Sequence, residues 1–424
     1  MAEPPAGAEQ PRLERRLGLG DAVVIGLGSM IGAGVFAALA PAAAAAGSGL
    51  LLGLGLAAAV AYCNATSSAR LAALYPASGG TYLYGRMRLG PLWGYLAGWS
   101  FVVGKIASCA AMALTVGAYV WPGHEREVAV AAVVALTALN YTGVQKAAWL
   151  TRTIVATVLL VLAAVVVASL ISGQAQADRL AITTDAGVRG VLQAAGLLFF
   201  AFAGYARIAT LGEEVRDPAR TIPRAIPLAL GITLVVYTAV AVTTLAVLGP
   251  RRLAETAAPL AEAVRAAGMP ALGPVVGAGA AIAALGSLLA LILGVSRTTL
   301  AMARDRRLPS FLAAVHPRFK VPHRAELTVG AVIAVLVLTT DLRGAIGFSS
   351  FGVLAYYAIA NAAAWTLAPG EGRPLRAVPI LGMVGCVALA FSLPVISVLS
   401  GSAVLAVGAI LYAARQTPSR PPTA

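Results

Sequence analysis

The amino-acid sequence predicts an all-α integral membrane protein with about twelve transmembrane helices. Of the 424 residues, 59% are hydrophobic and only 11% are charged, whereas a soluble domain of this length needs more charge on its surface. Apolar runs recur along the chain, and about 20 apolar residues are enough to cross the hydrocarbon core as a helix. The runs are rich in Ala, Leu and Val and do not alternate between apolar and polar residues, so they indicate helices and not barrel strands.

The basic residues are unevenly distributed among the predicted loops. The formal net charge is +14, and Lys and Arg cluster in alternate loops, for example at Arg86, at Arg88 and along Arg304–Arg324. Cytoplasmic loops of membrane proteins carry such an excess. We therefore expect a multi-pass protein with both termini in the cytoplasm. The high Ala, Gly and Arg content is typical of a GC-rich bacterial gene, which predicts the plasma (cell inner) membrane. The expected partner is the lipid bilayer and not nucleic acid, because the charge follows the membrane topology.

The apolar segments divide the chain into a membrane domain and two tails. The predicted spans are Leu19–Ala45, Gly49–Leu74, Pro91–Tyr119, Val128–Tyr141, Ala147–Ile171, Gly190–Leu211, Pro223–Leu248, Leu272–Met302, Leu327–Thr340, Ala345–Leu367, Val378–Pro394 and Ile396–Tyr412. We expect a cytoplasmic tail over residues 1–18, the membrane domain over 19–415 and a disordered tail over 416–424. Within the domain, residues 19–171 and 190–367 form two halves, and 378–412 adds two extra helices.

Two of the predicted helices are interrupted. The segment Gly26–Phe36 contains four glycines, each of which weakens a helix by roughly 1 kcal/mol relative to Ala. The segment Phe199–Thr210 contains Gly204 and Arg207 within an otherwise apolar span. Irregular backbone at membrane depth is tolerated where it lines a cavity, and paired interruptions in two halves of a chain indicate a transporter site. A small-residue packing stripe is the alternative for the first segment, but the second interruption disfavours it.

At these residues the chain resembles the amino acid–polyamine–organocation (APC) permease superfamily. The resemblance rests on the motifs Gly28–Phe36, Tyr75–Tyr82, Phe199–Arg224 and Ser296–Pro309, which together cover nearly the whole chain in order and spacing. It implies a five-plus-five inverted-repeat (LeuT-like) core with broken helices one and six. It also implies that an amino acid binds between the two breaks.

The resemblance assigns binding roles to backbone groups in both breaks. Backbone amides in the first break would bind the substrate carboxylate: Gly32, Ala33 and Gly34. Amides at the N-terminus of a half-helix attract anions, which supports this assignment. Backbone carbonyls would accept hydrogen bonds from the substrate ammonium: Ile31, Phe200 and Ala203. Gly204 would give the backbone the freedom to break the second helix. Phe200 stands at a position where members of the family often have an aromatic residue that closes the site.

Lys105 and Arg207 are basic residues inside predicted spans. Lys105 stands about 14 residues into its span, roughly 21 Å along the helix. Ionisable residues at such depth usually face a cavity and act there, and a desolvated lysine can give up its proton. Lys105 is therefore a candidate proton carrier. Arg207 either borders the pocket and attracts a carboxylate or pairs with Glu213 or Glu214, and the sequence leaves both interpretations open.

The charges predict the substrate class only in outline. We find no Asp or Glu deep in the predicted spans, and Ala206 stands where arginine exchangers of this superfamily carry an acid. A basic pocket disfavours cationic substrates, so we expect neutral zwitterionic amino acids first and acidic ones second. Val158 replaces the lysine that some members use in place of sodium, and only Ser287 offers an oxygen near a sodium site. We expect proton-coupled transport by alternating access, with an exchanger, a channel or a sensor as alternatives.

Enzymatic activity is not expected. His124, His316 and His323 lie in predicted loops, so no span carries the two-histidine zinc motif of metalloproteases. The chain also lacks the Gly-x-Ser-x-Gly motif of serine hydrolases. We accordingly expect no cofactor, no metal and no catalytic residue.

Overall fold

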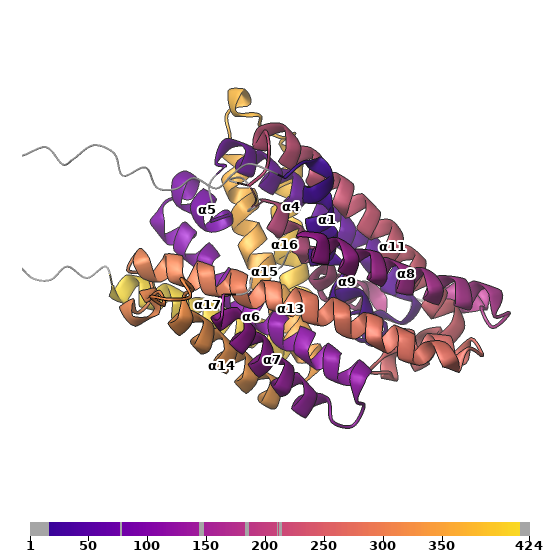
Figure 1. Cartoon of the computed structure of the whole chain (residues 1–424). Coiled ribbons are helices and arrows are strands. Elements are labelled where there is room, and N and C mark those ends of the chain that lie inside the picture. The colour runs from indigo at the N-terminus through magenta and orange to yellow at the C-terminus, as the bar shows by residue number, and fades with distance from the viewer. Residues whose placement is uncertain are drawn as a thin grey trace, which may run out of the picture.

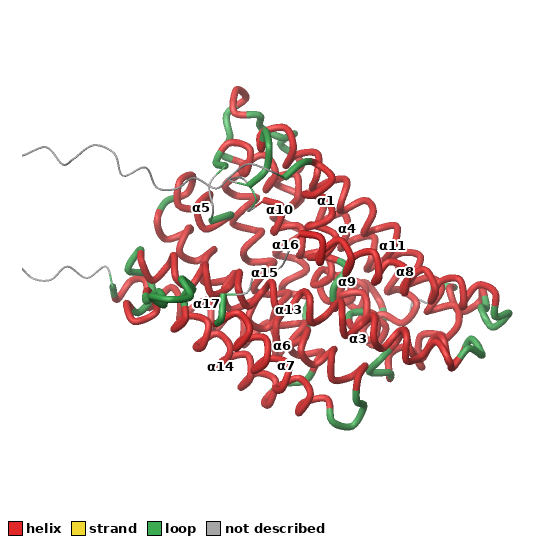
Figure 2. Tube along the Cα trace, viewed as in Figure 1, coloured by secondary structure: helices red, strands yellow, loops and turns green. Residues whose placement is uncertain are grey.

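The computed structural model describes residues 17–76, 79–143, 148–182, 186–209, 211 and 214–415. Within this part of the chain the structure is helical, and its only β pairing is an isolated bridge between Leu17 and Val215 (Figure 2). The all-α prediction is therefore confirmed. Apart from Leu17 and Gly18, the two predicted tails lie outside the described residues.

The helices follow one another with short connections. The α-helices are α1 (Leu19–Met30), α2 (Ala33–Ala37), α3 (Leu39–Ala46), α4 (Leu50–Leu74), α5 (Thr81–Leu89), α6 (Pro91–Val120), α7 (Glu125–Tyr141), α8 (Ala148–Ile171), α9 (Gly187–Phe202), α10 (Ala206–Ala209), α11 (Pro218–Glu255), α12 (Pro259–Ala266), α13 (Gly273–Arg304), α14 (His323–Thr339), α15 (Leu342–Trp365), α16 (Ala377–Ser392) and α17 (Val395–Ala414). The 3₁₀ turns are η1 (Gly47–Gly49), η2 (Ala177–Leu180), η3 (Ala203–Tyr205), η4 (Pro270–Leu272), η5 (Ser310–Ala313) and η6 (Pro369–Glu371).

Each of the twelve predicted spans coincides with a helical segment. Nine segments of the described chain are long and apolar enough to cross a membrane. The other three predicted spans correspond to α7, α14 and α16, which have 17, 17 and 16 residues. At 1.5 Å per residue these helices are about 24–26 Å long, slightly shorter than the hydrocarbon core. The count of twelve spans and the inverted repeat stay predictions.

Two helices were not predicted, α5 and α12. Their 9 and 8 residues are too few to cross a bilayer, so a search for long apolar runs passes over them. Helix α5 is joined to the end of α13, because Asp305 accepts hydrogen bonds from the Tyr82 hydroxyl and, at 3.2 Å, from Arg86. This connection places α5 beside the basic end of α13.

Both predicted interruptions are present, and they pack against each other. Between α1 and α2, Ile31 and Gly32 leave the helical region of backbone geometry. Between α9 and α10, the chain tightens into η3. A Cβ atom on Gly204 would lie only 2.2 Å from the carbonyl oxygen of Ser29. Glycine is therefore required where the second break meets the end of α1.

Helix α6 lies at the centre of the bundle, packed between α13 and α15 (Figure 1). Its contact with α15 is close, since a Cβ atom on Gly352 would lie 2.9 Å from the Cα atom of Gly104. Small residues allow such approaches between membrane helices. Helix α6 contacts α2 next to the first break, and its Lys105 donates a hydrogen bond to Ala203 in the second.

Candidate functional site

A cavity of about 280 Å³ lies where the two breaks approach α6 and α13. Its volume is just below the usual range of roughly 300–1,000 Å³ for small-molecule sites. The described wall includes polar and aromatic side chains from seven helices, α1, α5, α6, α9, α10, α13 and α15. The lining residues are Gly28, Ser29, Gly79, Tyr82, Gly98, Phe101, Lys105, Ser108, Met112, Phe200, Ala203, Gly204, Ala206, Arg207, Glu214, Ser287, Ala290, Leu291, Gly294, Arg297, Thr298, Ala301 and Tyr356.

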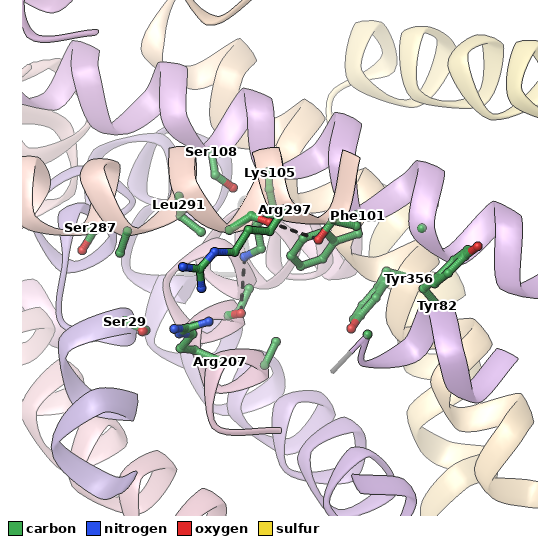
Figure 3. Close-up of a pocket in the computed structure, with 18 of the residues that line it drawn as sticks. Ser29, Tyr82, Phe101, Lys105, Ser108, Arg207, Ser287, Leu291, Arg297 and Tyr356 are labelled. Atoms are coloured by element: carbon green, nitrogen blue, oxygen red, sulfur yellow. Dashed lines mark hydrogen bonds between the residues drawn. The ribbon is translucent and has the colours of Figure 1, made fainter. Parts of the chain in front are cut away.

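Three basic side chains from different helices reach this cavity: Lys105 of α6, Arg207 of α10 and Arg297 of α13. Figure 3 shows the two guanidinium groups extending into the same space, with the Lys105 side chain beside them. Glu214 is the one carboxylate among the described lining residues. Among the described lining residues, basic side chains therefore outnumber carboxylates.

Lys105 is buried, with 6% of its surface exposed. Its Nζ donates a long hydrogen bond of 3.4 Å to the carbonyl oxygen of Ala203 in the second break. The hydroxyl of Tyr357 donates to the same oxygen, also at 3.4 Å. The carbonyl to which the resemblance assigned the substrate ammonium thus already accepts hydrogen bonds from Lys105 and Tyr357.

Both interpretations of Arg207 that the sequence left open stay predictions. Arg207 lines the cavity, and so does Glu214. The charge of Glu214 attracts Arg207, whereas that of Arg297 repels it. The backbone of Glu214 is held in place by Leu17, whose amide donates a 3.0 Å hydrogen bond to its carbonyl. Glu213 lies outside the described residues.

The structure brings together some of the predicted site residues and separates others. Those that line the cavity are Lys105, Phe200, Ala203, Gly204 and Arg207. Those of the first break are buried and are not part of its wall: Ile31, Gly32, Ala33 and Gly34. Ser287 stands in front of them, because a Cβ atom on Gly32 would lie 2.2 Å from its Oγ.

The hydroxyl of Tyr237 in α11 lies between the two breaks. It is 2.5 Å from the carbonyl oxygen of Met30 at the end of α1 and 3.0 Å from that of Ala201 in α9. A hydroxyl has one proton to donate, so it bonds to one carbonyl at a time. Tyr237 is buried and covers the carbonyl side of the first break.

Arg297 is the functional candidate that the sequence prediction missed. It stands within the predicted span Leu272–Met302, five residues before its end. A basic residue so close to a helix end is easily assigned to the loop that follows. A basic residue inside a predicted span, two turns before Arg304, indicates a side chain that faces a cavity. This position was the sequence signal for Arg297.

Glu326, which lies outside the predicted spans, is a buried acid in the first turn of α14. This residue is 0% exposed in α14, and neither of its carboxylate oxygens has a hydrogen-bond partner within the described chain. The predicted span began at Leu327, one residue too late to include it. Glu326 is not part of the cavity wall, although its charge attracts Arg297.

The family is decided by a match over most of the chain. The family model described as "Amino acid permease" matches residues 21–369. The chain belongs to the amino acid permease family. The permease is accordingly a multi-pass membrane protein of a transporter family, as the sequence predicted.

Individual relatives of the permease are also transporters by name. It is 75% identical over 408 residues to an uncharacterized transporter of Mycobacterium tuberculosis, covering 96% of this chain and 93% of that one. It is 31% identical to cationic amino acid transporter 4 of Homo sapiens, covering 81% of this chain and 58% of the human protein. It is 25% identical to the branched-chain amino acid permease BcaP of Bacillus subtilis, covering 96% and 94%.

Proposed function

We propose that the permease carries an amino acid across the plasma membrane by alternating access, with the cavity as its substrate site. The observation that supports this most is that the second break opens onto the cavity while the first lies directly behind Ser287. Transporter sites built from repeats lie where two broken helices meet. In this proposal residues 19–171 and 190–367 are the two repeats that move relative to each other.

The substrate backbone would bind to the groups assigned from the sequence. Amides of Gly32, Ala33 and Gly34 would bind its carboxylate, and carbonyls of Ile31, Phe200 and Ala203 its ammonium. Binding then requires two changes from the present arrangement. Ser287 must turn away from Gly32, and Lys105 must release the Ala203 carbonyl.

The second of these changes would couple transport to protons. In the proposal, Lys105 binds a proton, leaves the Ala203 carbonyl and faces the carboxylate of the incoming substrate. The proton on Lys105 and the substrate carboxylate then stabilise each other's binding. By linkage this mutual stabilisation is reciprocal, as symport requires. An exchanger would use the same site without net proton movement.

The orientation follows from the basic loops. With both termini in the cytoplasm, the end of α13 at Arg304 also faces the cytoplasm. The cavity wall extends to Tyr82 and Ala301 at that end. We infer that this arrangement is the inward-facing one.

The three basic side chains also bear on substrate class. Like charges repel, so a cationic amino acid is disfavoured even though the human relative is named for cationic substrates. With Lys105 and Arg207 in the site, a neutral zwitterionic amino acid is the first candidate substrate. The Bacillus subtilis relative is named for branched-chain amino acids, which are neutral zwitterions.

Uptake into proteoliposomes tests the proposed function. The purified permease would be reconstituted, and uptake of a radiolabelled amino-acid mixture followed with the interior alkaline, with and without a protonophore. For the wild type we expect saturable uptake that collapses when the protonophore is added. For Lys105→Ala we expect loss of this proton-driven uptake, while exchange with amino acid preloaded into the vesicles persists. Uptake confined to preloaded vesicles would identify an exchanger. Folded protein that takes up no amino acid under either condition would overturn the proposal.

A further inference from the structure

A buried carboxyl group lies outside the cavity, at Glu326 in the first turn of α14. Its side chain is 0% exposed, and neither of its oxygens has a hydrogen-bond partner within the described chain. An ionised carboxylate is costly to bury without hydrogen bonds, and a carboxyl group in such a position usually binds a proton and becomes neutral. The proposed function assigns no role to this group.

Glu326 lies on the face of α14 that packs into the bundle. Gly330 and Ile333, one and two turns farther along, are buried on the same face. At Gly330 the helix approaches α7 closely, since a Cβ atom there would lie 2.6 Å from Oγ1 of Thr137. Helices α6 and α13 also pack against α14. Solvent therefore does not reach the carboxyl group while these helices are packed together.

The elements packed against α14 bring few charged groups to Glu326. From α13 the charge of Arg297 attracts it, but the two side chains form no hydrogen bond. On α6, Lys105 donates to the Ala203 carbonyl instead, and η5 contains no titratable residue. The other titratable groups at this end of α14 are rings that pack on one another: Tyr141, His316 and His323. The described surroundings of Glu326 therefore offer its charge one attraction and no hydrogen bond.

We propose that Glu326 is a proton-binding site, at which the carboxyl group holds a proton while α14 is packed against α7 and α13 and releases it when that packing opens. The site goes beyond the proposed function, because it lies outside the cavity wall and can be tested without transport.

A proton held in this way makes the stability of the permease depend on pH. Burial raises the pKa of Glu326, and the positive charge of Arg297 opposes part of that rise. The folded chain therefore binds the proton more tightly than the unfolded chain does. The resulting stabilisation is fully present below the ordinary glutamate pKa of about 4.3 and is lost as the pH rises through the raised pKa of the folded protein.

Thermal unfolding in detergent, followed from about pH 5 to about pH 8, tests the site with variants that lack the titrating group. Glu326→Gln keeps the shape of the neutral acid. Glu326→Met puts no polar atom at the buried position and guards against a folding defect of the Gln variant. The quantity compared is the change with pH, so a constant effect of either substitution cancels. We expect the unfolding temperature of the wild type to fall by about 2 °C or more relative to both variants over this range.

Glu371→Gln is the matched control, because Glu371 is a paired carboxylate. It accepts a 3.0 Å hydrogen bond from Arg88, and this contact lowers the pKa of its carboxyl group. Glu371 therefore titrates below the range measured, and the difference between the wild type and Glu371→Gln should stay constant across it. A constant difference for the Glu326 variants as well, or a wild type that gains stability relative to them as the pH rises, would show an ionised Glu326 and overturn the proton site.

Discussion

The two interrupted helices of the permease differ in their breaks, a non-helical pair of residues in the first and a 3₁₀ turn in the second, and they meet the cavity differently. In the second break, Ala203 and Gly204 form part of the cavity wall. In the first break, Gly32 is buried behind Ser287, and Tyr237 covers the nearby carbonyl of Met30. Glycine content therefore locates a break in the sequence. The side chains packed around the break decide whether its backbone faces the cavity.

The largest effect is expected where the two breaks touch. A methyl group at Gly204 would meet the backbone of Ser29 at 2.2 Å, and backbone cannot rotate away as a side chain can. Gly204→Ala should therefore lower the free energy of unfolding by about 1–3 kcal/mol and abolish uptake. Thermal unfolding in detergent and proteoliposome uptake measure the two effects.

Gly231→Ala in α11 is the matched control, because nothing lies within 4 Å of its added methyl group. It should unfold at or slightly above the wild-type temperature, since Ala favours helix over Gly. If Gly204→Ala behaves like this control, the close packing of the two breaks is contradicted.

A smaller effect is expected from the hydroxyl that lies between the breaks. Tyr237→Phe removes the donor to the Met30 and Ala201 carbonyls and leaves them without this buried partner. We expect a loss of about 1–3 kcal/mol in unfolding free energy and slower uptake. Tyr62→Phe is the control, because Tyr62 is 54% exposed. Equal behaviour of the two variants would show that Tyr237 does not hold the first break.

The smallest effect is a coupling between Gly32 and Ser287. A methyl group at Gly32 would lie 2.2 Å from Ser287 Oγ and 3.0 Å from its Cβ. Ser287→Ala removes the closer atom, so it should partly rescue Gly32→Ala, with a coupling energy of about 0.5–1 kcal/mol. A double-mutant cycle on thermal unfolding measures it. Strict additivity would place Ser287 away from the first break.

Local features of the sequence predicted the spans and both breaks, because hydrophobic runs and clustered glycines act over a few residues. Lys105 and Arg207 were also found from the sequence, since a basic residue in an apolar span is conspicuous by itself. The helices α5 and α12 were missed because they are too short to form an apolar run that crosses a bilayer.

Arg297, Glu326 and the burial of the first break depend on tertiary packing. Arg297 reaches the cavity only because α13 packs against α6. Glu326 precedes the predicted span by one residue, and span boundaries are the least certain part of such a prediction. That Gly32 lies behind Ser287 depends on how α13 packs against the first break, which sequence spacing does not encode.

Filling the cavity tests the central claim, that this cavity is where the permease binds the amino acid it carries. The measurement is counterflow of a labelled amino acid in proteoliposomes, compared between Ala290→Trp and Ile282→Trp in α13. Ala290 lines the cavity, whereas Ile282 is 39% exposed and is not part of its wall. We predict that Ala290→Trp abolishes counterflow and that Ile282→Trp retains it. Wild-type counterflow in a folded Ala290→Trp variant would contradict the account.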